Sequence, residues 1–304
     1  MALHPLELEN KELVDSYCRK YPPLISELTF TNLFVWRQNR PVFFEEFKES
    51  LIFFAETGKS LVIMGNPLGP VSSTEVLARY REEVTGISRF PKKLMNDAIF
   101  PGAEISDDRD NADYVYRVEE LAALAGRHYT KKRNHINRCL AEHDCSYEII
   151  SPSNTGECIA MQDRWCMDRS CTTEPGLCGE YQAILDTFRH YEKLRLTGGA
   201  IRVDGTIEAF AIGEALNPTT AVCHFEKAMA SHHGLGQLIN QWFAAYSLSG
   251  FTYVNREQDL GIPGLRKAKK SYHPDHMVEK VKISLKKGEK CTVCNPQQCC
   301  RHER

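Results

Sequence analysis

The first part of the chain alternates short apolar stretches with polar turns. Three stretches share a dense apolar and aromatic pattern that predicts β-strands: residues 41–47, 50–54 and 60–64. A short helix is predicted over residues 10–21, because Pro22 follows it and cannot continue it. Another is predicted from Ser72 to about Glu83, since Ser72 can cap its first turn. This order predicts an α/β layer.

The second part shows a clearer succession of elements. Strand-like stretches occur at residues 146–150, 199–203, 206–214, 221–227 and 251–255. Helical spacing occurs at residues 156–168, 181–194 and 237–248. Asp204-Gly205 is typical of a two-residue hairpin turn, so we expect the second and third of these strands to pair.

The middle of the chain combines an acidic stretch with a basic one. Residues 101–113 hold five carboxylates, and we expect a solvated loop there. Residues 119–142 look helical, with an interruption near Gly126. Tyr129, Ile136 and Leu140 predict a buried stripe, and Arg133 lies on it. A buried guanidinium needs a partner or an anionic ligand, which makes Arg133 a candidate binding residue.

Length and composition limit the class of protein. The 304 residues suggest two domains, and 42% hydrophobic with 26% charged residues is ordinary for a globular protein. The formal charge of −2 argues against non-specific coating of nucleic acid. No apolar run reaches the roughly 20 residues that a membrane span needs, and no secretory signal is recognisable, so we expect a cytoplasmic protein. Most of the twelve cysteines are then expected to be reduced thiols.

One turn and the elements around it indicate a fold family. A hairpin, a further strand, a turn with Gly234 and Gly236 that opens a helix, and another strand follow in order. This order resembles GNAT-type acyltransferases, in which such a turn receives a pyrophosphate at the helix start. Ser231 stands where that family usually has Arg or Gln.

A second resemblance covers nearly the whole chain. Four stretches resemble the C-terminal domain of phosphatidylglycerol lysyltransferases and the related Fem-type aminoacyl transferases: residues 28–37, 129–137, 251–256 and 264–274. The resemblance implies an α/β (α+β) fold of two tandem GNAT-like domains, each with a mixed central sheet flanked by helices. We expect an N-terminal domain over 1–126, a basic connecting helix over 127–144, a C-terminal domain with the site over 145–290, and a Cys-rich tail over 291–304.

Aminoacyl transfer needs a proton acceptor and groups that hold the carrier. Glu226, His224 and Glu214 are the candidate catalytic residues, and the two-residue spacing of His224 and Glu226 predicts that they share one strand face. The candidate substrate- and carrier-binding residues are Lys132, Arg133, Asn134, Gly234, Gly236, Asn255, Arg256, Arg266, Lys269 and Tyr272. Aminoacyl-tRNA or acyl-coenzyme A is the expected donor. The acceptor is expected to be a small molecule, a peptide or a lipid headgroup.

Two other hypotheses remain open. The chain could keep the fold as a non-catalytic binding or sensor protein for a nucleotide, an amino acid or tRNA, which Ser231 favours. The tail offers soft metal ligands in Cys291, Cys294, Cys299 and Cys300, although their spacing is tighter than in ordinary zinc ribbons. No resident cofactor is predicted.

Overall fold

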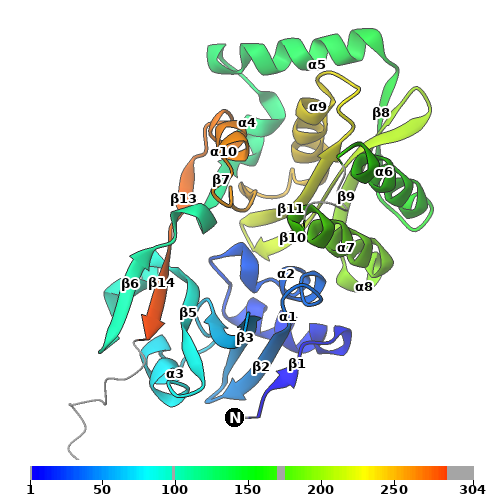
Figure 1. Ribbon diagram of the computed structural model, residues 1–304. Coiled ribbons are helices and arrows are strands. Elements are labelled where there is room, and N and C mark those ends of the chain that lie inside the picture. The colour runs from blue at the N-terminus through cyan, green and yellow to red at the C-terminus, as the bar shows by residue number, and fades with distance from the viewer. Residues whose placement is uncertain (1, 98–99, 170–174, 286–304) are drawn as a thin grey trace, which may run out of the picture.

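Two mixed β-sheets organise the protein. The computed structural model describes residues 2–97, 100–169 and 175–285 (Figure 1). The first sheet has the order β1-β2-β3-β4-β5-β14-β6. Its strands are β1 (His4–Pro5), β2 (Val42–Phe47), β3 (Ser50–Thr57), β4 (Ser60–Met64), β5 (Val84–Pro91), β6 (Ala103–Asp107) and β14 (Lys280–Leu285).

The second sheet has the order β13-β7-β12-β11-β10-β9-β8. Its strands are β7 (Asp113–Arg117), β8 (Cys145–Ile149), β9 (Thr197–Val203), β10 (Thr206–Asn217), β11 (Thr220–Ala228), β12 (Tyr253–Asn255) and β13 (His276–Val278). The predicted hairpin is confirmed, because β9 and β10 pair on either side of Asp204-Gly205.

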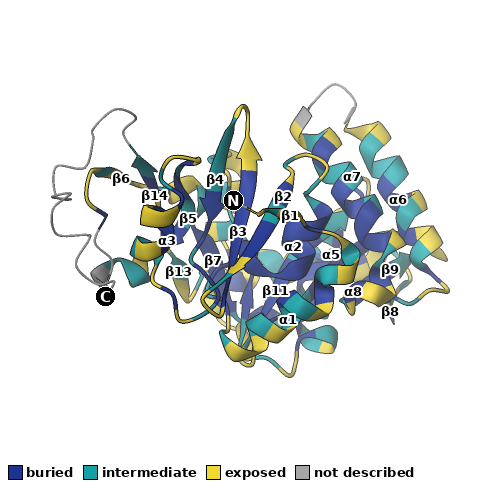
Figure 2. Cartoon of the chain, turned by 90° about the horizontal axis from the view of Figure 1, so that it is seen from below, coloured by how far each residue is buried: buried dark blue, intermediate teal, exposed yellow. Residues whose placement is uncertain are grey.

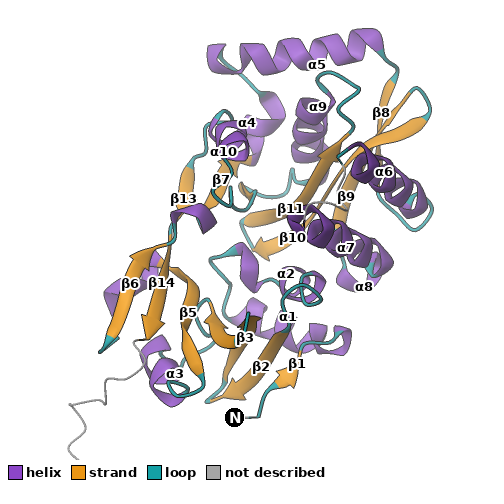
Figure 3. Cartoon of the chain, viewed as in Figure 1, coloured by secondary structure: helices purple, strands orange, loops and turns teal. Residues whose placement is uncertain are grey.

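Helices flank both sheets (Figure 3). They are α1 (Lys11–Lys20), α2 (Phe30–Val35), α3 (Ser73–Arg79), α4 (Val118–Ala123), α5 (Thr130–Glu142), α6 (Thr155–Asp168), α7 (Pro175–Arg189), α8 (Tyr191–Leu194), α9 (Leu235–Trp242) and α10 (Pro263–Lys270). A π-helical turn, Phe243–Ser247, continues α9. Among the described residues, every helix is too short or too polar to cross a bilayer.

Each sheet contains one strand or more from the other half of the chain. β7 precedes residue 126 and pairs with β12 and β13 of the second sheet. β14 follows the whole second sheet and lies between β5 and β6 of the first. The domain limits expected from the sequence stay a prediction, and the two sheets cross them.

A shared hydrophobic core joins the halves. Phe30, Leu33 and Phe34 of α2 lie in one buried cluster with Phe188 of α7 and Phe210 of β10. Figure 2 shows α2 and β3 buried in the middle of the molecule. Fully burying such a side chain stabilises a fold by roughly 1.5–3 kcal/mol, so this interface holds the two sheets together.

The predicted fold class is confirmed, and two local predictions are wrong. Residues 103–107 form the edge strand β6, not a loop, because β14 pairs with a stretch whose acidic side chains face solvent. Tyr129 and Ile136 are buried as predicted, but Leu140 is 42% exposed, and Cys139 is the buried residue at the end of this side of α5.

Candidate functional site

The site is built where two parallel strands part. β11 and β12 pair only from Thr220 opposite Tyr253 to Val222 opposite Asn255. Beyond those residues, side chains fill the space between the strands. We call this region the strand wedge; it is lined by Leu121, Cys223, Glu226, Asn240, Phe243, Ala244, Leu248, Val254 and Arg256.

A β-bulge in β11 decides which side chains face the strand wedge. Ile212 pairs with Phe225 and Gly213 pairs with Cys223, so His224 is the extra residue. Glu226 contacts Asn240 of α9, whereas His224 contacts Glu257, which is in turn hydrogen-bonded to α2. The prediction that His224 and Glu226 share one face is therefore wrong, because a bulge breaks the period of two.

Glu226 and Arg256 form an ion pair inside the strand wedge. Nη2 of Arg256 donates to both carboxylate oxygens at 2.9 and 3.0 Å, and Nδ2 of Asn240 donates to Oε2 at 3.0 Å. Two buried polar atoms here, Nη1 of Arg256 and Oδ1 of Asn240, have no hydrogen-bond partner among the described residues. The remaining cavity is about 10 Å³, about the space of one water molecule.

Two lysines with lowered pKa values flank Arg256. Nζ of Lys269 donates to the backbone oxygen of Arg256, and burial together with Arg256 lowers the pKa of Lys269 to about 8. Nζ of Lys132 lies 3.7 Å from the ring centre of Tyr272 and donates to Ser271. Burial, Arg256 and Lys131 lower its pKa to about 8 as well. Cations crowd this end of the strand wedge, which favours an anionic or electron-rich ligand.

On the opposite side of β11, His224 lies between two carboxylates. Its Nε2 is 2.9 Å from Oε1 of Glu214, and its Nδ1 is 2.9 Å from Oε1 of Glu257. Burial alone would lower the pKa of His224, but the two hydrogen-bonded carboxylates outweigh burial and raise it to about 9. Asn32 of α2 also donates to Glu257 at 2.9 Å. The imidazole is therefore charged at neutral pH and is no free base.

The glycine turn at the start of α9 is covered by α5. Gly234 has φ +94°, and a Cβ on it would lie 2.1 Å from the backbone oxygen of His135. Two histidine contacts hold the same interface, one between His135 and His233 and one between His143 and His232. A carbonyl oxygen thus faces the turn that would receive a pyrophosphate, and Gly236 follows it inside the helix.

Four other predicted binding residues lie elsewhere or serve packing. Asn255 is fully buried and donates to Asp113 at 2.9 Å. Arg266 is held by Asp259 and Asp110. Arg133 donates to backbone oxygens at the end of α4, including that of Gly126 at 2.8 Å, so its partner is the protein itself. Asn134 is exposed.

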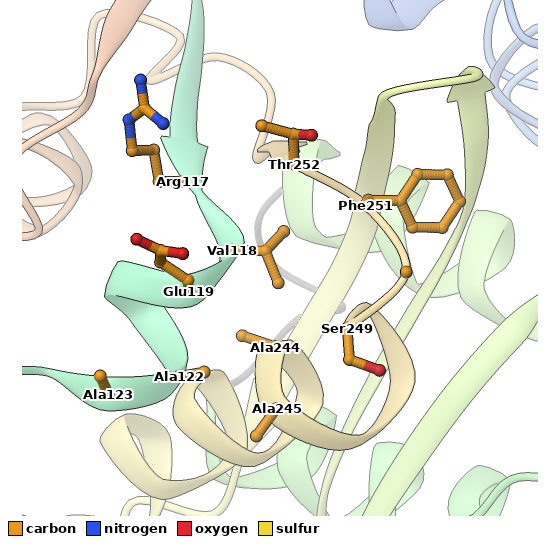
Figure 4. Close-up of a pocket in the computed structure, with 11 residues that line it drawn as sticks. Arg117, Val118, Glu119, Ala122, Ala123, Ala244, Ala245, Ser249, Phe251 and Thr252 are labelled. Carbon is orange, nitrogen blue, oxygen red and sulfur yellow. The ribbon is translucent and has the colours of Figure 1, made fainter.

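A groove of about 680 Å³ adjoins the strand wedge (Figure 4). It lies between α4 and residues 244–252, with Arg117 and Glu119 on one side and small side chains such as Ala245 and Ser249 on the other. Ala244 lines both the groove and the strand wedge, so the two adjoin at this small side chain. Within the described part of the chain no cluster of three or more metal-ligating side chains occurs. The predicted cysteine ligands of the tail lie outside the described residues.

Sequence reasoning missed Asn240, Glu257 and Asn32. Asn240 gave a usable signal, because it interrupts the apolar sequence of α9 between Ile239 and Phe243. Glu257 and Asn32 gave none, since they meet only through tertiary contact across 225 residues.

Comparisons with known proteins identify the family. The family model for the C-terminal part of phosphatidylglycerol lysyltransferase matches residues 19–282. A crystal structure of a conserved protein of unknown function from Bacteroides thetaiotaomicron VPI-5482 is 33% identical, covers 94% of this chain and 100% of that chain, and has a TM-score of 0.87. The structure of L-PGS from Bacillus licheniformis is 14% identical over 91% of this chain and 92% of that chain, with a TM-score of 0.62, and supports the fold alone.

A curated relative bears a different name. Ferredoxin–NADP reductase 1 of Bacillus mycoides is 23% identical over 201 residues, which are 66% of this chain, and the chain spans about half (54%) of that protein's length. The G-x-G-x-x-G dinucleotide fingerprint is absent from the sequence, where Ile239 stands at the last glycine position after Gly234 and Gly236. With 264 matched residues and a relative that is one-third identical along its whole length, the chain belongs to the family of the phosphatidylglycerol lysyltransferase C-terminal domain.

Proposed function

We propose that the protein is an aminoacyltransferase that moves an aminoacyl group from a tRNA carrier to a hydroxyl or amine acceptor. Family membership supports acyl or aminoacyl transfer as the class of reaction. The observation that carries the proposal is the pair of unpartnered polar atoms in the strand wedge, a donor on Arg256 and an acceptor on Asn240. An α-aminoacyl ester offers a carbonyl oxygen for the donor and an amino group for the acceptor.

The residues of the strand wedge suit each step of such a transfer. The acceptor's oxygen or nitrogen attacks the carbonyl carbon while Glu226 takes its proton. Nη1 of Arg256 stabilises the oxygen that gains charge. Collapse of the tetrahedral intermediate breaks the bond to the carrier's ribose oxygen, and Glu226 returns the proton to that leaving group. The adjoining groove gives the acceptor an approach along Ala244.

The packing of α5 against the glycine turn at the start of α9 favours tRNA over coenzyme A as donor. The backbone oxygen of His135 packs against Gly234, 2.1 Å from where a Cβ would lie, and a carbonyl oxygen at the turn repels an anion. Lys131, at the start of α5, and Arg127, in the turn before it, are exposed, have no carboxylate partner among the described residues and can bind tRNA phosphates. Calorimetry with acetyl-coenzyme A should therefore show no binding, and micromolar affinity would contradict this choice of donor.

The test of transfer uses purified protein and a pool of aminoacyl-tRNAs, with loss of the ester and the mass of the product as readouts. Glu226→Gln should slow transfer at least about a hundredfold, the usual contribution of a positioned base. Glu120→Gln, a change on the exposed side of α4, is the control and should transfer normally. Equal rates for wild type and Glu226→Gln would remove Glu226 from the mechanism.

A non-catalytic binding protein is the second candidate. The small cavity in the strand wedge favours it, because about 10 Å³ leaves no room for an aminoacyl group unless side chains move. Detection of any transferred group by mass spectrometry excludes this candidate. Binding of an amino acid or tRNA without any product would support it.

A further inference from the structure

Four histidines join α5 to the turn that precedes α9, two from each element. His135 lies within α5 and His143 ends it, while His232 and His233 are neighbours in the turn. The helix and the turn lie side by side (Figure 1). The facing nitrogens of His135 and His233 are 2.5 Å apart, whereas those of His143 and His232 are 3.4 Å apart. The closer pair and the wider pair can therefore do different chemistry, although the same elements carry them.

Carboxylates decide where each imidazole of the wider pair holds its proton. Nδ1 of His143 is 2.8 Å from Oδ2 of Asp204, whose other oxygen accepts from the backbone N–H of Asp144 at 3.0 Å. Nε2 of His232 is 4.0 Å from Oε2 of Glu208. A neutral imidazole carries one proton, and a carboxylate favours that proton on the nitrogen that faces it. The lone pairs of Nε2 of His143 and Nδ1 of His232 then face each other.

The separation in the wider pair suits a tetrahedral metal ion. Two ligands at the usual Zn–N distance and the tetrahedral angle lie about 3.3–3.4 Å apart. The separation of 3.4 Å matches this value, and it is long for a hydrogen bond between the two rings. In the closer pair, 2.5 Å leaves no room for an ion between the nitrogens. The side chains of His143 and His232 are 25% and 20% exposed, so an ion from solution can reach them.

We propose that His143 and His232 bind a zinc ion that fastens α5 to the turn before α9. Imidazole nitrogen suits Zn²⁺, and a carboxylate behind a metal-bound histidine raises its basicity and fixes its orientation. Asp204 has that position behind His143, and Glu208, whose other oxygen accepts from Arg164, has it behind His232. The described residues supply no third ligand, so water fills the remaining positions and the affinity is lower than that of a four-ligand site. The proposal does not depend on the proposed transfer reaction.

The experiment measures amide hydrogen exchange of the full chain at neutral pH, under reducing conditions, over a range of Zn²⁺ concentrations. Exchange reports the position of an effect along the chain, which separates this site from zinc held by cysteines elsewhere. Zn²⁺ should slow exchange at the end of α5 and in the turn at residues 229–234. In His143→Gln and in His232→Gln this protection should disappear at the concentration that saturates wild type, because one imidazole cannot join two elements. Exchange without zinc, measured in parallel, shows that each variant is folded.

Two matched variants separate a metal site from ordinary packing. Asp204→Asn keeps a residue that suits this hairpin turn, removes the carboxylate behind His143, and should weaken zinc binding about 10–100-fold. His135→Gln with His233→Gln removes the closer pair from the same two elements and should leave the zinc affinity unchanged. Absence of zinc-dependent protection in wild-type α5 overturns the proposal. So does wild-type zinc affinity in His143→Gln, or loss of the protection only when His135 and His233 are replaced.

Discussion

Replacing His224 tests whether this imidazole is charged in the folded protein. Its side chain is 3% exposed between Glu214 and Glu257, and its pKa is raised from 6.5 to about 9. A shift of this size corresponds to about 3 kcal/mol of folding free energy. Because the folded pKa lies above the unfolded one, the contribution is complete below about pH 6.5 and is lost as the pH rises through about 9. Between pH 7 and 9.5 the loss should be about 2 kcal/mol.

The assay is urea unfolding of wild type and His224→Gln at several pH values from 7 to 9.5. Lys132 and Lys269 titrate in the same range, and their lowered pKa values make stability rise with pH above about 8. Subtracting the free energy of unfolding of His224→Gln from that of wild type cancels the contribution of the two lysines, because both proteins contain them. This difference in the free energy of unfolding should be largest at pH 7 and should decrease steadily as the pH rises. A gap that stays constant would refute the charged imidazole, whatever its absolute size.

Three further changes have defined outcomes. Gly234→Ala should destabilise the protein and loosen α5, seen as faster hydrogen exchange there, whereas Gly236→Ala should be tolerated because its Cβ would meet its nearest neighbour at 4.0 Å. Lys280→Met should cost about 3–5 kcal/mol in urea unfolding, since it removes the one cation paired with the buried carboxylate of Asp113 among the described residues, while Lys282→Met at an exposed position of the same strand should cost little. In Lys269→Met the free energy of unfolding should rise less steeply above about pH 8 than in wild type, because a lysine with a lowered pKa destabilises the folded state only while it is protonated. A rise as steep as that of wild type would assign the effect to other groups.

Local patterns allowed much of the fold to be predicted, and tertiary contacts decided the rest. The hairpin at Asp204-Gly205 follows from turn chemistry within a few residues, and so does the N-cap of α3, where Ser72 accepts from the backbone of Glu75. The edge strand β6 could not be predicted, because its only reason to be extended is β14, about 175 residues later.

In the candidate site too, some residues could be predicted from the sequence, whereas their contacts depend on the tertiary structure. Glu226 and Arg256 were both singled out, but their pairing depends on where β11 and β12 part. The bulge at His224 carries no sequence signal that separates it from regular alternation, and it moves one predicted catalytic residue to the other side of the sheet. Arg133 was singled out for the right reason, a half-buried guanidinium, yet backbone oxygens supply its partners.

The exchange of strands between the sheets has a consequence for synthesis of the protein. β14 lies between β5 and β6, so those two strands keep unpaired edges until the ribosome has added about 170 more residues. Unpaired edges invite pairing with other chains, and contacts this distant in sequence form slowly. The first sheet cannot mature before the second half of the chain exists, so we expect nascent chains that stop before β14 to aggregate or to need a chaperone. The half translated first is thus among the last to fold.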